Sequence, residues 1–388
     1  MYPTLEDLKK IAESGSYRRI PVAREVYSDR FTPVEVMRTL RAASRHCYLL
    51  ESAEDNQKWG RYSFLGYSPS LELTCKNGVL RVRRGEEDEL TEETTTGTIH
   101  PGEAIRRILD DYKSPKLENM PPFTGGLVGY FSYDYIKYAE PSLNTNGLKN
   151  NDFCDVDLML FDRVIVFDHY KQKLILIAGV DPSDPDRSYR EASEKLDEIE
   201  KLLGSEAKAV FKPLKLKEKL TPAFSKKEYC RMVEKARHYI REGDIFQVVL
   251  SDPLTAAAGG SLFDTYRVLR TTNPSPYMFY FSSDDVEIAG ASPETLAKLE
   301  NETLFNFPLA GTRPRGRDTV EDQALERELL ADTKELAEHN MLVDLGRNDL
   351  GRVCRLGTVN VLKYCTIERF SHVMHIGSTV SGTIRKDK

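Results

Sequence analysis

The chain has 388 residues, of which 40% are hydrophobic and 30% charged, and its formal net charge is −6. This composition is typical of a globular protein and excludes disordered and fibrous classes. The apolar runs are too short to cross a bilayer and the start has no secretion signal, so we expect a cytoplasmic protein with no membrane partner. Because no block of Lys or Arg alternates with aromatic residues, we expect no nucleic-acid partner. Six scattered cysteines without a C-x-x-C pair indicate reduced thiols rather than a zinc site.

The first half of the chain is rich in strand signals. A short apolar run that ends in polar residues predicts a strand at 47–52. Runs at 71–74 and 79–82 flank Asn77-Gly78, a pair that favours a hairpin turn because both residues tolerate a positive φ. Two further runs predict a second hairpin, at 164–167 and 174–178.

A helix and a connector follow these strands. Apolar residues at helical spacing predict a helix that ends near Gly204: Ala192, Leu196, Ile199 and Leu203. Residues 204–222 then lose this periodicity and are rich in lysine. We therefore expect a connector here between an N-terminal lobe, 1–203, and a second region, 223–388.

The second region opens with a strong helix signal. Ser225 precedes Glu228 by three positions, a capping box that satisfies otherwise unpaired amide groups, so we predict a helix from there to Gly243. Three short strand-like runs then predict an antiparallel meander: 286–290, 295–299 and 303–307. Residues 321–345 return to helical spacing, through Leu325, Leu329, Leu336 and Leu345.

Two carboxylates in this last helix could hold a metal ion. Glu335 and Glu338 stand three positions apart, so their side chains project from one face. Magnesium prefers oxygen ligands and keeps several waters, so two carboxylates and an anionic substrate would complete its site. A solvated acidic helix face explains the same pair, and the pair alone does not decide between the two readings.

Two further segments carry groups that could bind or react with a substrate. Residues 308–316 combine glycines, the hydroxyl of Thr312 and two guanidinium groups, which can bind a carboxylate or simply shape a loop. His372 and His375 fall in one strand-like run, where a separation of three places them on opposite faces. One of them could carry a proton near neutral pH, or it could be a packed, hydrogen-bonded histidine.

Seven segments together carry a resemblance to a known family. They are Leu-Leu-Glu-Ser at 49–52, Gly-Gly-Leu-Val-Gly-Tyr-Phe-Ser-Tyr-Asp at 125–134, and the segments 243–251, 273–280, 308–316, 335–349 and 373–375. With them the chain resembles component I of anthranilate synthase, in the chorismate-utilising enzyme family, along nearly all its length. The resemblance implies an α+β fold in which two antiparallel-rich sheets stack at a steep angle with helices outside.

The resemblance also implies roles for single residues in a chorismate site in the C-terminal half. Glu335 and Glu338 form one side of a magnesium site, and Gly311 and Thr312 contact the substrate. His375, with Thr312 beside it, takes part in catalysis near the leaving group of the ring. The implied reaction converts chorismate and ammonia to anthranilate and pyruvate, with the ammonia supplied by a glutamine amidotransferase subunit, component II.

One position separates this activity from those of related enzymes. Relatives that add water to chorismate, or that make aminodeoxychorismate, tend to carry lysine just before the Gly-Thr pair, where this chain has Ala310. A lysine amine can act as base or nucleophile and alanine cannot, so Ala310 favours anthranilate formation. Aminodeoxychorismate synthase, or another chorismate enzyme, stays the alternative.

The resemblance further implies a feedback site for L-tryptophan as inhibitor in the N-terminal half. Glu51 and Ser52 would bind its amino group, and Pro276, Tyr277 and Met278 would supply an apolar wall. A strand end and a core-lining segment explain the same residues without a ligand.

Members of this family continue beyond the point that corresponds to Lys388. Their additional part brings a second carboxylate pair for magnesium, a glycine-rich turn and a substrate-binding arginine. From the resemblance we therefore expect an incomplete site, weak magnesium binding and little activity of this chain alone. A third hypothesis follows, in which the chain is a non-catalytic module that binds tryptophan or the amidotransferase.

Overall fold

The computed structural model describes residues 1–52, 60–85, 91–96, 100–140, 142–143 and 152–388. Its contacts divide the chain into two compact units, one made of Met1–Ala209 with Val268–Lys388 and the other of Val210–Arg267. The predicted connector at 204–222 crosses the first of these boundaries. The units therefore do not coincide with the lobes expected from composition, and the division into lobes stays a prediction.

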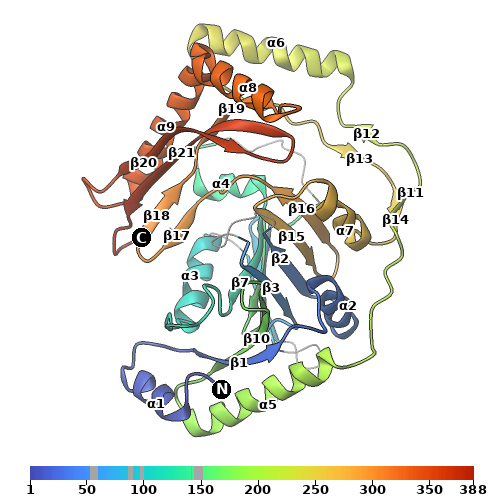
Figure 1. Ribbon diagram of the computed structural model, residues 1–388, viewed down its shortest axis with the longest axis vertical. Helices are drawn as coiled ribbons and strands as arrows, with labels where there is room; N and C mark the ends of the chain where they lie inside the picture. Colours follow the sequence, from blue (N-terminus) through green and yellow to red (C-terminus); the bar gives the residue numbers. More distant parts are fainter. Residues whose placement is uncertain (53–59, 86–90, 97–99, 141, 144–151) are drawn as a thin grey trace. The chain divides into compact units, whose positions relative to one another are not determined.

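The largest sheet has seven strands in the order β1-β10-β9-β3-β2-β15-β16, and all its described pairings are antiparallel (Figure 1). The predicted strand at 47–52 and the hairpin of β9 and β10 are confirmed. Helix α5 (Pro185–Leu203) packs on β10 and buries the four apolar residues that predicted it. The strands are β1 (Ile20–Tyr27), β2 (Cys47–Glu51), β3 (Tyr62–Tyr67), β9 (Arg163–Asp168), β10 (Lys173–Val180), β15 (Tyr277–Ser282) and β16 (Glu287–Ser292).

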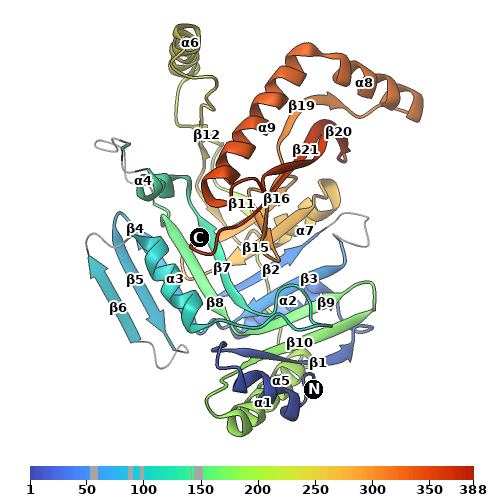
Figure 2. The same ribbon diagram turned by 90° about the vertical axis from the view of Figure 1, so that its left-hand side faces the viewer.

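A second, five-stranded antiparallel sheet has the order β6-β5-β4-β8-β7. The predicted hairpin turn is confirmed between β4 and β5, where Asn77 and Gly78 have φ of 51° and 78°. Helix α3 (Pro101–Asp111) covers one face of this sheet by packing on its apolar residues (Figure 2). The strands are β4 (Leu71–Lys76), β5 (Val79–Arg84), β6 (Thr91–Thr96), β7 (Gly126–Phe131) and β8 (Val156–Phe161).

The other face of the five-stranded sheet packs against the seven-stranded one. Tyr48 and Phe281 from the larger sheet meet Met159 and Phe161 of β8 in one buried cluster. Each of these four side chains is at most 6% exposed. Burial of aromatic and aliphatic surface on this scale is the main stabilising contribution to a two-layer arrangement. The α+β class and the stacking of antiparallel sheets are thus as expected.

A third sheet carries the C-terminal strands β17 (Lys298–Glu300), β18 (Thr303–Asn306), β19 (Leu309–Pro314), β20 (Asn360–Arg369) and β21 (Val373–Thr383). β21 is its centre, because β18, β19 and β20 all pair with it. The predicted meander is wrong at its first strand: β16 pairs with β15 in the seven-stranded sheet, and only β17 and β18 form a hairpin.

Two helices pack on this third sheet where one was predicted at 321–345. They are α8 (Thr319–Ala331) and α9 (Thr333–Val353). Asp332 separates them with an extended backbone, and its carboxylate caps α9 by accepting from the amides of Lys334 and Glu335. Asp prefers this N-cap position to a helix interior, so the break has a local cause. Leu329 and Val343 reach the core from the two helices.

The smaller unit contains helix α6 (Lys226–Glu242) and short strands. The capping box of Ser225 and Glu228 forms as predicted, and Gly243 ends the helix in the left-handed region, with φ of 82°. No residue of α6 is buried. The unit's strands are β11 (Lys215–Leu216), β12 (Thr221–Pro222), β13 (Leu254–Thr255) and β14 (Ala258–Gly259), and α7 (Phe263–Thr272) crosses its boundary. The remaining helices are α1 (Leu5–Glu13), α2 (Pro33–Ala43), the 3-10 turn η1 (Tyr133–Tyr135) and α4 (Ile136–Ala139).

All six cysteines are free thiols, and three of them are buried. Among the helices of the described ranges, none combines the length and the apolar character needed to cross a bilayer.

Candidate active site

Strands β19 and β21 bring Gly311, Thr312 and His375 together. Thr312 lies opposite His375, and the register shifts between Ala310 and Thr312, so Gly311 sits in a bulge. Gly311 has φ of +70°, a conformation that glycine adopts at little cost. Nδ1 of His375 lies 2.9 Å from the carbonyl oxygen of Gly311 and 3.1 Å from the hydroxyl of Thr312.

These two contacts define the tautomer of His375. A carbonyl oxygen can only accept, so Nδ1 must carry the proton and donate it to Gly311. In neutral His375 the lone pair therefore resides on Nε2, which makes no hydrogen bond to the part of the chain that the structure describes. Nε2 is thus the atom that can exchange a proton with a bound molecule.

Glu335 joins this group from the first turn of α9. A Cβ added to Gly311 would lie 3.2 Å from Ile376 and from Leu329, and 3.3 Å from Oε2 of Glu335. Only glycine therefore fits between β21, α8 and the Glu335 carboxylate. The structure thus gathers four of the predicted site residues: Gly311, Thr312, Glu335 and His375.

Glu338 lies one turn further along α9 and is exposed, whereas Glu335 is half-buried. Neither carboxylate forms a hydrogen bond or ion pair with another described residue. No group of three or more His, Cys, Asp or Glu side chains in the described ranges is arranged to hold a metal ion. Two unengaged carboxylates fit a magnesium ion that keeps most of its waters, because such an ion needs few protein ligands.

The other histidines near this sheet are not placed for proton transfer. His372 is exposed in the turn before β21, where Nδ1 of its ring meets the hydroxyl of Ser371 at 2.9 Å. His339 is fully buried beneath the sheet, where its Nε2 meets the hydroxyl of Ser378 at 2.7 Å. Burial lowers the pKa of His339, because it disfavours the charged imidazolium. Of the two histidines predicted on opposite faces, only His375 reaches the site.

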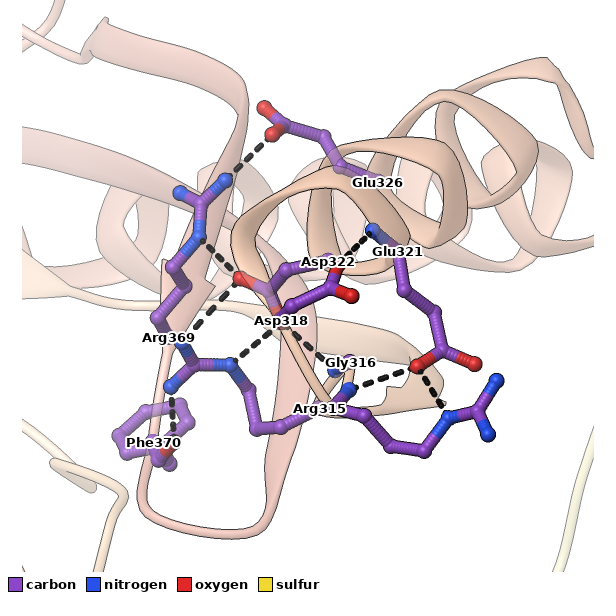
Figure 3. A network of polar contacts seen from close by, with 9 residues as sticks. Arg315, Gly316, Asp318, Glu321, Asp322, Glu326, Arg369 and Phe370 are labelled. Atoms are coloured by element: carbon purple, nitrogen blue, oxygen red, sulfur yellow. Dashed lines mark hydrogen bonds and ion pairs between the residues drawn. The ribbon is translucent and has the colours of Figure 1, made fainter.

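The two arginines of the 308–316 segment are engaged by the chain's own carboxylates. Arg313 donates to Glu328 at 2.9 Å and to Asp332 at 3.0 Å. Arg315 donates through two nitrogens to Asp322, at 2.8 and 3.1 Å (Figure 3). The segment's predicted anion-binding guanidinium groups are therefore used to hold β19 against α8 and α9.

The residues predicted to bind tryptophan divide between two faces of the seven-stranded sheet. Met278 pairs directly with Glu51 across β2 and β15, so these two share a face and Tyr277 points to the other. Pro276 and Tyr277 line a pocket of about 220 Å³. The hydroxyl of Ser52 is buried and has no hydrogen-bond partner among the described residues.

Glu51 already has a charged partner. Its side chain is 6% exposed, and Arg270 approaches both of its oxygens, Nε at 2.7 Å and Nη2 at 2.8 Å. A two-point guanidinium–carboxylate pair of this kind is strong and directional. A ligand amino group would therefore have to share or displace Arg270. The sequence gives no sign of this pairing, because 219 positions separate the two residues.

The pocket beside Tyr277 also contains residues that sequence reasoning missed. Lys363 and Glu368 of β20, which form an ion pair, contribute to its wall, as does the ring of Phe370. The Tyr277 hydroxyl meets that of Thr295, another lining residue, at 2.6 Å. The lining is therefore a mixture of apolar and polar groups that includes an ion pair.

Comparisons with known proteins agree on one family. Residues 45–388 match the family model described as chorismate binding enzyme. Anthranilate synthase component 1 of Acetivibrio thermocellus is 43% identical over 399 aligned positions, which cover 100% of this chain and 78% of that protein. The same component of Acinetobacter calcoaceticus is 39% identical, over 97% of this chain and 76% of that protein. The crystal structure of anthranilate synthase component I from Streptococcus pneumoniae TIGR4 superposes with a TM-score of 0.69 at 34% identity, covering 84% of this chain and 70% of that one. The chain therefore belongs to the chorismate binding enzyme family, among its anthranilate synthase component 1 members.

Proposed function

We propose that this chain converts chorismate and ammonia to anthranilate and pyruvate. The observation that carries the proposal is the arrangement of His375 against Gly311 and Thr312, with Nδ1 anchored and Nε2 available. In the proposed reaction ammonia adds at C2 of the ring while the C4 hydroxyl leaves as water. The enolpyruvyl group then leaves as pyruvate, and the ring becomes aromatic.

Each of these steps moves a proton, and His375 is the group we assign to that task. Its ring is held at Nδ1, so Nε2 can donate a proton to a leaving oxygen or accept one from the ring. Thr312 supports the imidazole through its hydroxyl, and its backbone, with that of Gly311, lines the space in which a substrate would bind. Gly311 allows Glu335 to approach this strand closely, because a Cβ there would lie only 3.3 Å from its carboxylate.

Glu335 and Glu338 are the residues that would hold magnesium. A bound magnesium ion would act as a Lewis acid toward a substrate carboxylate. The two side chains support this assignment by their chemistry, since carboxylate oxygens are the ligands that the ion prefers and neither is engaged by a described cation.

Ala310 favours anthranilate over the products of related chorismate enzymes. It occupies β19 directly before Gly311 and offers no amine to the ring. The nucleophile must then come from outside the site, which agrees with ammonia delivered by a glutamine amidotransferase subunit, component II. We further propose feedback inhibition by tryptophan at the pocket beside Pro276 and Tyr277, and a cytoplasmic location, which the free thiols support.

The test uses the full chain with chorismate, magnesium and excess ammonium at mildly alkaline pH, and it follows anthranilate fluorescence. The expected result is a loss of about 10²- to 10⁴-fold in the kcat of anthranilate formation for His375→Gln relative to the natural sequence, the usual range for a general acid or base. His372→Gln is the matched control, an exposed histidine three positions away, and should keep the natural rate. Equal rates for the two variants would contradict the role of His375.

Pyruvate release separates this activity from its alternatives. Anthranilate formation frees one pyruvate per chorismate, whereas aminodeoxychorismate and isochorismate keep the enolpyruvyl group. Consumption of chorismate without pyruvate would therefore favour another chorismate enzyme. Tryptophan binding with no chemistry, even with the amidotransferase present, would favour a non-catalytic module.

A further inference from the structure

Asp322, in the first turn of α8, accepts four hydrogen bonds from three residues (Figure 3). Arg315 donates to both of its oxygens, the amide of Gly316 donates to Oδ1 at 2.8 Å, and Nε of Arg369 donates to Oδ2 at 3.2 Å. The residue is only 8% exposed. The hydrogen bond from Arg315, with those from Gly316 and Arg369, holds the pKa of Asp322 well below its usual range, so the carboxylate is charged throughout the working pH.

The donors of this network hold the turn between β20 and β21. Arg369 is the last residue of β20. Arg315 also donates through Nη1 to the carbonyl oxygen of Phe370, at 2.8 Å. The backbone amide of Arg315 donates to the carbonyl oxygen of His372, at 3.1 Å. Hydrogen bonds thus hold the turn against the loop after β19 at several points. Asp322 orients the guanidinium groups of Arg315 and Arg369 that take part.

The fastened turn contacts the proposed proton carrier. The ring of Phe370 lies against the imidazole of His375, with centroids 5.5 Å apart and planes at 57°. The imidazole is therefore held at Nδ1 by Gly311 and Thr312, and against its ring by Phe370. A shift of the turn would move Phe370 off the ring. The imidazole could then turn away from the Gly311 carbonyl and lose, for part of the time, the hydrogen bond that fixes its tautomer.

We propose that Asp322 is a positioning residue for His375, acting through Arg315 and Arg369 on the turn that carries Phe370. The inference rests on the proposed function, because it gives His375 the proton transfer. Misplacement of a reacting group by about 1 Å can cost about 10²-fold in rate. Asp322 itself touches no reacting atom in this arrangement.

The informative variant is Asp322→Asn, which keeps the shape of the side chain. Its Oδ1 can still accept from Nε of Arg315 and from the amide of Gly316, but its Nδ2 places a donor against two donors, Nη2 of Arg315 and Nε of Arg369. Two of the four hydrogen bonds are therefore lost. We expect kcat to fall about 10- to 100-fold while KM changes by less than about 3-fold. The limb of the pH–rate profile that reports the imidazole should shift as well.

Glu321→Gln is the matched control. It removes a neighbouring carboxylate from the same turn of α8, where Glu321 pairs with the exposed Arg317 and with nothing in the β20–β21 turn. A purely structural role for charge at this helix start would lower activity and stability alike in both variants. Positioning predicts that only Asp322→Asn changes kcat and the pH profile.

A second readout does not depend on turnover. Nitrogen-15 spectra of the histidine rings, assigned through His375→Gln, report the tautomer of His375 directly. We expect the Nδ1–H form in the natural chain and in Glu321→Gln, and a mixture of tautomers in Asp322→Asn. Phe370→Leu should give the same mixture, and it replaces Asp322→Asn in the comparison if that variant does not fold.

The outcomes distinguish the inference from the function on which it rests. No anthranilate from the natural chain would contradict the proposed function, while the ring spectra would still test the positioning. Natural kcat and an unchanged His375 tautomer in Asp322→Asn would overturn the inference and leave the function standing.

Discussion

At the scale of single residues, Gly311 decides the shape of the candidate site. Its positive φ turns the β19 carbonyl toward His375, and its missing side chain lets Leu329, Ile376 and Glu335 approach the strand closely. Both requirements are met by glycine alone, since other residues reach this φ only under strain. One residue thus sets both the tautomer of the histidine and the close approach of the acid.

Gly311→Ala should destabilise the protein and lower its activity together. The variant combines backbone strain with contacts of 3.2 Å to the buried side chains of Leu329 and Ile376, so we expect a loss of about 2–4 kcal/mol in the free energy of unfolding. Gly357→Ala is the control, because Gly357 has φ of 79° and nothing within 4 Å of an added Cβ. It should lose only about 1 kcal/mol. Urea unfolding measures both, and equal losses would show that packing around Gly311 does not matter.

The sequence indicates that Gly311, Thr312 and His375 belong to one site, but it does not indicate which residues position them. Gly311 and Thr312 are adjacent in the chain, and His375 was singled out by the family resemblance. Asp322 and Phe370 carried no comparable signal, because a carboxylate in an acidic helix start and an aromatic residue in a turn are common. The proposed role of these two residues depends on contacts between distant parts of the chain. Arg369 and Asp322, for example, are 47 positions apart, and no local sequence pattern predicts that they meet.

At the scale of elements, local signals predicted helices better than strand partners. The capping box at Ser225 and the glycine at 243 define both ends of α6, because each satisfies backbone groups that the helix leaves unpaired. The predicted meander is wrong at its first strand because a short strand-like run does not show which strand it will pair with, and β16 pairs with β15 instead. β18 pairs with β21, as Thr303 with Thr383, and no turn signal predicts such a pairing.

The cap of α6 allows a local test of helix stability. No residue of α6 is buried, so the helix depends on its own ends more than on packing. Ser225→Ala removes the hydroxyl that accepts from the amide of Glu228, and it should cost about 1 kcal/mol, or about a 5-fold rise in amide exchange across α6. Hydrogen-exchange mass spectrometry measures this. Ser251→Ala, at an exposed position of the same unit, should leave α6 exchange unchanged, and equal effects would contradict the capping role.

At the scale of the whole molecule, the packed interface between the two large sheets contains a buried carboxylate. Asp157 of β8 is 3% exposed, and its Oδ1 has no hydrogen-bond partner among the residues that the structure describes. Burial, followed by the charges of Glu72 and Asp285, raises the pKa of Asp157 to about 7. Asp284 adds a further negative charge on the side of the larger sheet. Arg83 and His46 lie beside these carboxylates. The packed interface between the two sheets is therefore more stable when Asp157 is protonated.

This carboxylate predicts a stability that falls as the pH rises. The unfolded chain loses the Asp157 proton near pH 4, whereas the folded protein keeps it to about pH 7, so folding binds a proton between these values. The free energy of unfolding should therefore decrease from pH 4 to pH 7 and stay reduced above it, by about 2–4 kcal/mol from this residue. Asp157→Asn keeps the shape and removes the charge. We expect the variant to lose this decrease and to exceed the natural chain in stability at pH 8.

Asp155 separates the effect of charge from that of burial. It is also buried, one strand position outside β8, but its oxygens accept from Lys137, from the hydroxyl of Tyr138 and from the amide of Asn77. Asp155→Asn leaves these donors without a charged acceptor, so it should destabilise the protein where Asp157→Asn stabilises it at pH 8. Urea unfolding from pH 5 to pH 8 distinguishes the two. If both variants followed the pH dependence of the natural chain, the contact between the sheets would owe nothing to the protonation of Asp157.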